Sequence, residues 1–188
     1  MDLFNSFDEY DEQGYQYLVR ERHGYFKDLY KVLGIRFTNH NPVIPFYYKG
    51  ELIYYQIKFA FGNNRMPYFS PPIEYKPGYL IEHDDNKKFI ICEGTFDAIS
   101  LLIQAPSYTP FAILGSSITD YQITMLRSFV PEKIIVYMDT TELSIKVVNK
   151  IKKYINYADV NIIKSYGKDP EENLRYRLAE EMVVSWIN

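Results

Sequence analysis

Short apolar runs alternate with amphipathic stretches over the second half of the chain, from about residue 88 onward. The apolar runs predict β-strands, and the stretches between them carry hydrophobic residues at helical spacing, as Leu143, Val147 and Ile151 do. Strands that are apolar throughout and joined by helices are typical of a parallel sheet covered on both faces. We therefore predict a four-stranded, mainly parallel α/β sheet, with strands at 88–92, 111–114, 133–138 and 160–163 and helices at 97–103, 121–129, from 142 and at 170–186.

The first half of the chain has a different pattern, which predicts a smaller α+β subdomain. Hydrophobic positions over 15–32 predict one or two short helices, and two β-branched and aromatic runs around Lys49-Gly50 predict a β-hairpin over 43–61. Residues 62–78 contain four prolines and two glycines, which favours a boundary there. The predicted domains are an N-terminal subdomain over 1–78, made of a loosely held acidic arm (1–14), helices and a hairpin, and a second domain over 79–188.

Composition narrows the class of protein. The chain has 188 residues, 47% of them hydrophobic and 17% aromatic, as in a folded globular protein. No apolar run is long enough for a membrane span, and the first residues do not resemble a secretory signal, so we expect a cytoplasmic protein without membrane contact. Three scattered histidines and one cysteine, Cys92, offer no zinc spacing, and Cys92 inside an apolar run is expected to be a buried small hydrophobe.

Charge is distributed unevenly. The net charge is −3, yet the first 14 residues carry five acids and no base. Residues 20–36 instead hold five basic and two acidic residues: Arg20, Arg22, Lys27, Lys31 and Arg36 against Glu21 and Asp28. This basic segment is either a surface for nucleic-acid phosphates or an ordinary solvated helix face, and charge alone does not decide between them.

Acids and glycines follow all four predicted strands. Ligand sites of open α/β sheets lie at the carboxyl ends of the strands, so these residues are expected at one edge. Carboxylates gathered without Cys or His select Mg²⁺ or Mn²⁺, and the candidates are Glu93, Asp97, Asp139 and Asp169. Alternatively, Asp97 and Asp139 only cap the helices that follow. Gly94 and Gly115 fit close approach of a phosphate to the backbone, although each alone could be a simple turn.

The order of these segments resembles a known family. Glu93-Gly94 with Asp97, then LGSSIT at 114–119, a strand ending on Asp139, and GKDP at 167–170 resemble the TOPRIM domain of DnaG-type bacterial primases and phage primase-helicases. Upstream, YLVRERHG, LGIRF and the hairpin before MPYFSPP resemble that family's N-terminal subdomain in layout. The resemblance implies a DNA primase catalytic core that joins ribonucleoside triphosphates on a single-stranded DNA template, in phage or plasmid replication.

The same resemblance implies roles for individual residues. Glu93 would be the central ligand or base and Asp139 the bridging ligand of a Mg²⁺ or Mn²⁺ site, with ligands of a further ion at Asp97, Asp169 and Glu171. Contacts to nucleotide or DNA phosphates would come from Lys58, Arg65, Gly94, Gly115 and Lys168. A helicase and a separate DNA-recognition protein are the implied partners.

The sequence departs from the family pattern at two places. Thr141 stands where the family has the second aspartate of a DxD strand end, with Glu142 as a substitute charge, and Pro67 replaces a basic residue. The first change favours an alternative, a primase-like accessory or regulatory subunit with weakened catalysis; a nuclease using the same acids is a third reading. The aromatic residues of the hairpin region could stack bases or form cross-strand pairs: Tyr47, Tyr48, Tyr54, Tyr55, Tyr68 and Phe69.

Overall fold

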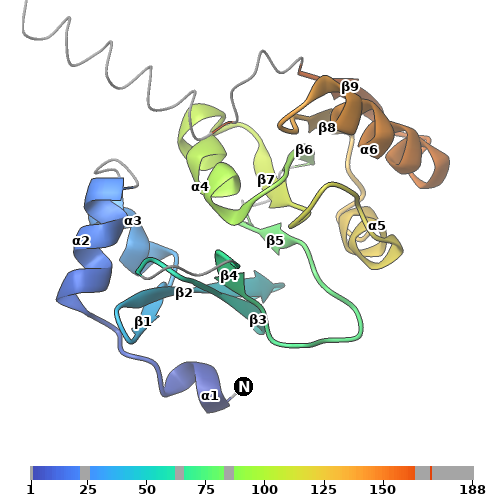
Figure 1. Ribbon diagram of the computed structural model, residues 1–188. Coiled ribbons are helices and arrows are strands. Elements are labelled where there is room, and N and C mark those ends of the chain that lie inside the picture. Colours follow the sequence, from blue (N-terminus) through green and yellow to red (C-terminus); the bar gives the residue numbers. More distant parts are fainter. Residues whose placement is uncertain (1, 22–25, 62–65, 83–86, 164–169, 171–188) are drawn as a thin grey trace, which may run out of the picture. The chain divides into compact units, whose positions relative to one another are not determined.

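The computed structural model describes residues 2–21, 26–61, 66–82, 87–163 and 170, and divides the chain into two compact units, Met1–Glu74 and Tyr75–Asn188 (Figure 1). The division falls inside the proline-rich segment 62–78. Each unit has a sheet of its own, so the fold is a mixed α/β fold with an antiparallel and a mixed sheet. The predicted helix at 170–186 lies outside the described residues, apart from its first residue.

The N-terminal unit packs helices with a four-stranded antiparallel sheet in the order β1-β2-β3-β4. The predicted hairpin is β2 and β3, joined by Lys49 and Gly50, whose positive φ angles of 51° and 77° suit a tight two-residue turn. Its elements are α1 (Asp2–Asn5), α2 (Glu12–Glu21), α3 (Phe26–Val32), β1 (Arg36–Thr38), β2 (Asn41–Tyr48), β3 (Glu51–Lys58) and β4 (Tyr68–Phe69).

The prediction of a loosely held acidic arm over residues 1–14 was wrong. Phe4 is buried, Asp8 forms an antiparallel bridge with Phe37, and the Arg36 guanidinium donates to the carbonyl oxygens of Asn5 at 3.1 Å and Phe7 at 3.2 Å. The segment contains two phenylalanines, Phe4 and Phe7, among its acids. Those rings have an apolar surface to cover, and they hold the segment against the sheet.

The C-terminal unit is built on a five-stranded sheet in the order β5-β7-β6-β8-β9, with β5 antiparallel at one edge and the other four strands parallel. The four predicted parallel strands are therefore present, and the sheet has a fifth strand that the sequence did not predict. Its elements are β5 (Tyr79–Leu80), β6 (Lys88–Cys92), α4 (Thr95–Gln104), β7 (Thr109–Ala112), α5 (Asp120–Arg127), β8 (Lys133–Val136), α6 (Thr141–Tyr154) and β9 (Asp159–Ile162).

The core of this unit is mainly aliphatic and lies on both faces of the central strands. Four of the five β6 residues are buried, as expected for a strand with helices on both sides. Edge strand β5 is seated through Gly78, where a Cβ atom would lie only 2.2 Å from the ring of Phe111. Glycine is therefore required at the position where the proline-rich segment enters the sheet.

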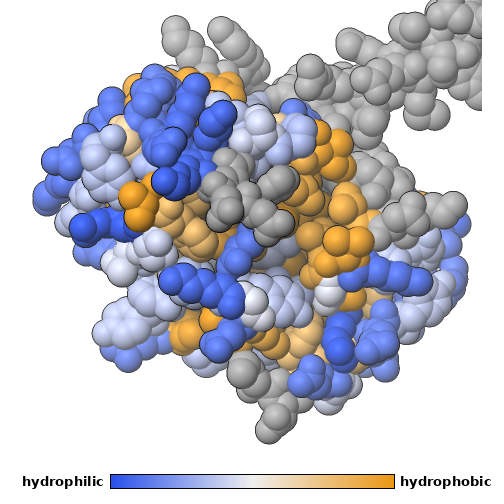
Figure 2. Space-filling view, turned by 180° about the vertical axis from the view of Figure 1, so that it is seen from behind, coloured by the Kyte–Doolittle hydropathy of each residue, from blue (hydrophilic) through white to orange (hydrophobic). Residues whose placement is uncertain are grey.

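The surface carries exposed hydrophobic side chains in separate patches, seen in orange among blue hydrophilic residues on the face drawn in Figure 2. Such patches are common on folded proteins. Within the ranges that the structure describes, none of the helices has the length and apolar character needed to cross a membrane.

Candidate functional site

Three loops meet at the carboxyl ends of β6, β7 and β8, the central strands of the parallel sheet. The Leu114 N–H donates to the Glu93 carbonyl oxygen at 2.8 Å, which ties the loop after β7 to the loop after β6. The Tyr137 N–H donates to the Ile91 carbonyl oxygen at 2.8 Å, which ties the segment leading from β8 to Asp139 to strand β6. Because these bonds extend the sheet pairing beyond the strands, the residues that follow are held in fixed relative positions.

Glu93 has a carboxylate with an unsatisfied oxygen. Its Oε2 atom is buried and finds no hydrogen-bond partner among the residues that the structure describes. Burial raises the pKa of the Glu93 carboxyl, and the negative charge of Asp139 raises it further. A buried acid oxygen without a partner is costly, and a bound cation would remove that cost.

Asp97 and Asp139 differ in their local roles. Asp97, in the first turn of α4, is buried, and its Oδ2 atom accepts a hydrogen bond from the Gly94 N–H at 2.9 Å. It therefore helps to fix the start of that helix. Asp139 does not cap α6, because Thr140 is the N-cap residue and its hydroxyl accepts from the Leu143 N–H at 3.3 Å. The cap interpretation thus describes Asp97 and does not account for Asp139.

Cys92 reports how close the three acids are to one another. Its thiol is fully buried, as predicted, and burial raises its pKa well above the usual range; Asp97, Asp139 and Glu93 each add to the rise through their charges. All three carboxylates therefore lie near enough to the sulfur atom for their charges to act on it. A buried thiol with a raised pKa is a poor nucleophile, so Cys92 acts here as a core residue.

The fit to a metal ion rests on two carboxylates. Across the described ranges, no group of three His, Cys, Asp or Glu side chains is close enough to hold a metal ion. Glu93 and Asp139 are near each other, one oxygen of Glu93 is free to accept a cation, and oxygen ligands suit Mg²⁺ and Mn²⁺. The residues present therefore fit a divalent cation at Glu93 and Asp139, while Asp169 and Glu171 lie outside the described residues.

The glycines of the site have different surroundings. Gly115 has a φ of +155°, and no described residue lies within 4 Å of the place where its Cβ atom would be, so this side of its backbone has room for a ligand. At Gly94 a Cβ atom would lie 3.0 Å from the Oδ2 atom of Asp97, so a side chain would crowd the hydrogen bond between them. Gly94 therefore protects the Asp97 contact, and its N–H group is already used.

Of the three predicted phosphate-binding cations, Lys58, Arg65 and Lys168, the structure describes Lys58. Lys58 belongs to the N-terminal unit, where its amino group lies over the ring of Tyr68 at 4.4 Å from the ring centre. Arg65 and Lys168 fall outside the described residues. The described part of the C-terminal unit instead supplies a different cation at this edge, Lys76.

Lys76 and Gln122 shape the loop after β7, and neither was predicted. Lys76 donates to the Leu114 carbonyl oxygen at 3.2 Å, and burial lowers the pKa of its amino group. The buried amide of Gln122 donates to the carbonyl oxygens of Ile113 at 2.8 Å and Pro77 at 3.2 Å, while its oxygen accepts from the Thr119 N–H at 2.9 Å. The spacing of Thr119 and Gln122, that of a capping box, was the signal that could have been read.

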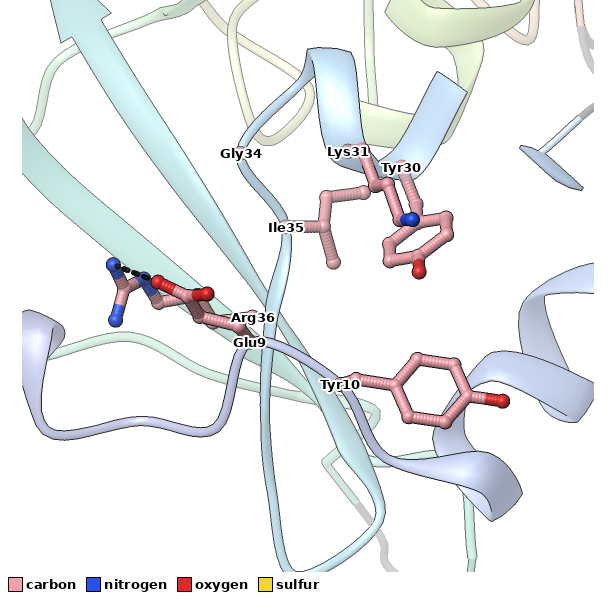
Figure 3. A pocket seen from close by; sticks show the side chains of 7 residues that line it. All are labelled: Glu9, Tyr10, Tyr30, Lys31, Gly34, Ile35 and Arg36. Carbon is pink, nitrogen blue, oxygen red and sulfur yellow. Dashed lines mark hydrogen bonds and ion pairs between the residues drawn. The ribbon is translucent and has the colours of Figure 1, made fainter. Parts of the chain in front are cut away.

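A separate cavity of about 630 Å³ lies in the N-terminal unit (Figure 3). Tyr10, Tyr30 and Lys31 line one part of it, and the ion pair between Arg36 and Glu9, 3.5 Å apart, lines another. Arg36, one of the five basic residues of segment 20–36, is thus occupied by Glu9 and by the two carbonyl oxygens of the first residues. The lining has two basic side chains, Lys31 and Arg36, against one acid, Glu9, and the Arg36 charge is paired with Glu9.

Comparison with known proteins matches residues 90–174 to the Toprim-like family model. Among solved structures, the primase of Aquifex aeolicus (zinc-binding and RNA polymerase domains) is 22% identical with a TM-score of 0.57, over 76% of this chain and 38% of that one. A DNA primase domain from Pseudomonas aeruginosa is 16% identical with a TM-score of 0.57, over 72% and 47%. The primase fragment of the bacteriophage T7 primase-helicase is 16% identical with a TM-score of 0.56, over 83% and 68%.

The chain thus spans less than half of the two bacterial chains. At these identities the likeness is one of fold. Among curated proteins, none matches the sequence.

Proposed function

Because the chain carries a Toprim-like domain and resembles in fold the catalytic core of bacterial and phage primases, we propose that it is a primase core, which synthesises short RNA primers on single-stranded DNA. The observation that carries the proposal is the unsatisfied Oε2 atom of Glu93 beside Asp139. An acid pair of this kind at the carboxyl edge of a parallel sheet is suited to metal-dependent phosphoryl transfer.

Glu93 and Asp139 would hold a Mg²⁺ or Mn²⁺ ion. Such an ion would neutralise negative charge on the attacking 3′-oxygen and on the pyrophosphate leaving group of the ribonucleoside triphosphate. The chain's own contribution is position: the hydrogen bonds from Leu114 and Tyr137 hold the two acids at neighbouring strand ends. Glu93, with its raised pKa, is also the candidate to accept the proton of the attacking 3′-hydroxyl.

The substrate phosphates would meet the loop after β7. Gly115 presents an open backbone there, and Lys76 adds a positive charge behind it. The remaining candidates keep their proposed roles: Asp97, Asp169 and Glu171 at a further ion, and Lys58, Arg65, Gly94 and Lys168 toward nucleotide or template. A helicase is the proposed partner because the T7 neighbour is a fragment of a primase-helicase. A separate DNA-recognition protein is the second proposed partner, as the family resemblance implies.

One observation favours a second function, an accessory subunit with weakened catalysis. Thr141 begins α6 where the resemblance implies an aspartate, and Glu142 beside it is exposed. A hydroxyl is a neutral and poorer ligand for Mg²⁺ than a carboxylate, so the site holds less charge than the family pattern.

The test is a primer-synthesis assay with single-stranded DNA, labelled ribonucleotides and either Mg²⁺ or Mn²⁺, using the wild type, Glu93→Ala, Thr141→Asp and the control Glu132→Gln. We expect short oligoribonucleotides from the wild type and the control, none from Glu93→Ala, and more from Thr141→Asp. Product from Thr141→Asp alone would establish the accessory function instead. No product from any variant would overturn the proposal.

A further inference from the structure

We propose that Tyr75 and Tyr121 form a platform on which a base of single-stranded nucleic acid stacks next to the Glu93 edge. This tyrosine platform rests on the proposed function, because it supplies a place for a strand that the enzyme would hold. It assigns a role to two residues that neither the family resemblance nor the acid cluster includes.

The two rings form an exposed aromatic pair. Their centres are 5.7 Å apart and their planes differ by 31°, while 57% of Tyr75 and 40% of Tyr121 remain exposed. Phe89 and Phe129 form another aromatic pair of this unit, but Phe89 is only 1% exposed. Two exposed rings tilted by 31° present aromatic faces to water, and a nucleobase can stack on such a face.

Neighbouring residues anchor both tyrosines to the loop after β7. Lys76, next to Tyr75, donates to the Leu114 carbonyl oxygen at 3.2 Å. Gln122, next to Tyr121, donates to the Pro77 carbonyl oxygen at 3.2 Å. The two ring-bearing segments are therefore fixed to each other, so binding of a base would require little ordering of the platform.

The same contacts connect the platform to the candidate site. The Leu114 residue that accepts from Lys76 also donates its N–H to the carbonyl oxygen of Glu93 at 2.8 Å. Hydrogen bonds thus connect Glu93 to Leu114, and Leu114 to Lys76, which is the residue next to Tyr75. We therefore expect a strand whose phosphate or 3′-end reaches Glu93 to stack a nearby base on the rings.

The occupant that fits is a nucleic-acid strand rather than a protein segment. The loop after β7, to which both segments are bonded, continues from Leu114 with Gly115 and the exposed side chains of Ser116 and Ser117, which suit a sugar-phosphate chain. Stacking on tyrosine is tolerant of base identity, as copying a template requires. A protein contact at the same rings is the alternative that the test must separate.

The test measures binding of a short fluorescent oligothymidylate by anisotropy, with Tyr75→Ala, Tyr121→Ala and Tyr121→Trp. Tyr157→Ala is the matched control, since Tyr157 is an exposed tyrosine of the same unit. We expect each alanine variant at the platform to weaken binding by ~5-fold or more. Tyr121→Trp should keep the affinity of the wild type because it keeps an aromatic face, and Tyr157→Ala should bind as the wild type does.

Two further conditions identify stacking as the cause. The loss should disappear with an abasic oligonucleotide, which keeps the phosphates but has no bases. It should also persist at high salt, because stacking does not depend on counterion release as phosphate contacts do. Melting curves of the variants should match the wild type, since both rings are exposed.

Unchanged DNA affinity of Tyr75→Ala and Tyr121→Ala, an equal loss with the abasic strand, or no binding by the wild type would overturn the platform. The first result would leave a protein contact as the use of the rings. Primer synthesis is measured on the same preparations. Synthesis with ring-independent binding would refute the platform alone, whereas ring-dependent binding without synthesis by any variant would refute the proposed enzyme alone.

Discussion

The acids of the two units have opposite surroundings. In the N-terminal unit, Asp11 accepts from the Gly14 N–H at 2.7 Å and lies 2.9 Å from the His40 ring, while Glu12 accepts from Tyr10 and Gln16. In the C-terminal unit, one buried oxygen of Glu93 has no hydrogen-bond partner within the described part of the chain. Satisfied acids hold a fold together, whereas an acid left unsatisfied at a sheet edge is a candidate for chemistry.

The aromatic residues show a parallel contrast. Rings of the N-terminal unit pack on one another, as Phe7 does on Tyr55 at 5.5 Å and Phe46 on Tyr54 at 5.3 Å. Tyr54 is buried and donates to the Pro71 carbonyl oxygen at 2.6 Å. For Tyr54 and Tyr55 of the hairpin, the structure supports packing against other rings. Tyr47 and Phe69 are exposed. The exposed pair of Tyr75 and Tyr121 lies in the other unit.

The largest expected effect separates the acids of the two units. Asp139→Asn should reduce primer synthesis by on the order of 100-fold or more, because it removes one negative charge from the candidate metal site. Glu9→Gln, the control, removes an acid that is paired with Arg36 and should leave the rate unchanged. Rates of ribonucleotide incorporation under saturating Mg²⁺ measure this, and equal losses in both variants would remove the distinction.

Close packing at a glycine should affect both units. Gly78→Ala places a Cβ atom 2.2 Å from Phe111, and Gly14→Ala places one 2.4 Å from Phe37. We expect each to lower the free energy of unfolding by about 1–3 kcal/mol. The Gly14 variant should lose less, because alanine stabilises a helix by about 1 kcal/mol relative to glycine.

Urea denaturation measures these losses, with Ser116→Ala as the control at an exposed loop position. A Gly78→Ala protein as stable as the wild type would show that β5 is not seated as described.

Loss of a helix cap should have a smaller effect. Asp11→Ala should cost about 1 kcal/mol, because the Gly14 N–H loses its acceptor. Burial acts to raise the pKa of Asp11, but the bonds from Gly14 and His40 outweigh it, so the pKa lies below its ordinary value of 3.8. The stabilisation is therefore present above pH 3.8 and lost as the pH falls through the lowered value.

Thermal unfolding at several pH values measures the cap, and Asp11→Asn is the matched control because asparagine also caps helices. If Asp11→Asn lost as much stability as Asp11→Ala at neutral pH, the His40 contact rather than the cap would be the important one.

The smallest expected effect has the opposite sign. The pKa of Glu93 is raised above its ordinary value of 4.5, so the folded protein binds this proton more tightly than the unfolded chain does. The contribution of Glu93 to the free energy of unfolding therefore falls as the pH rises from 4.5 through the raised pKa of the folded protein. Without divalent cations, Glu93→Gln should melt slightly above the wild type at neutral pH, and the difference should vanish below pH 4.5. A lower melting temperature for the variant would mean that Glu93 has a stabilising partner.

Sequence patterns predicted β6 and β8 because these strands lie in apolar runs that end before an acid, Glu93 and Asp139. They did not predict β5, since two residues behind a run of prolines carry no periodicity. The packing of the first segment was not predicted, because its five acids favour an exposed segment while the buried side chain of Phe4 holds it against the unit. Lys76, Tyr75 and Tyr121 could not be found from sequence, because their roles depend on contacts between segments distant along the chain.

The central claim is that Glu93 and Asp139 together hold a divalent cation. Calorimetric titration of the wild type with Mn²⁺, beside Glu93→Gln and the control Glu9→Gln, tests it without any need for activity. We expect the wild type and Glu9→Gln to bind Mn²⁺ alike and Glu93→Gln to lose most of the affinity. Equal Mn²⁺ binding by all three proteins, or by none, would contradict the account.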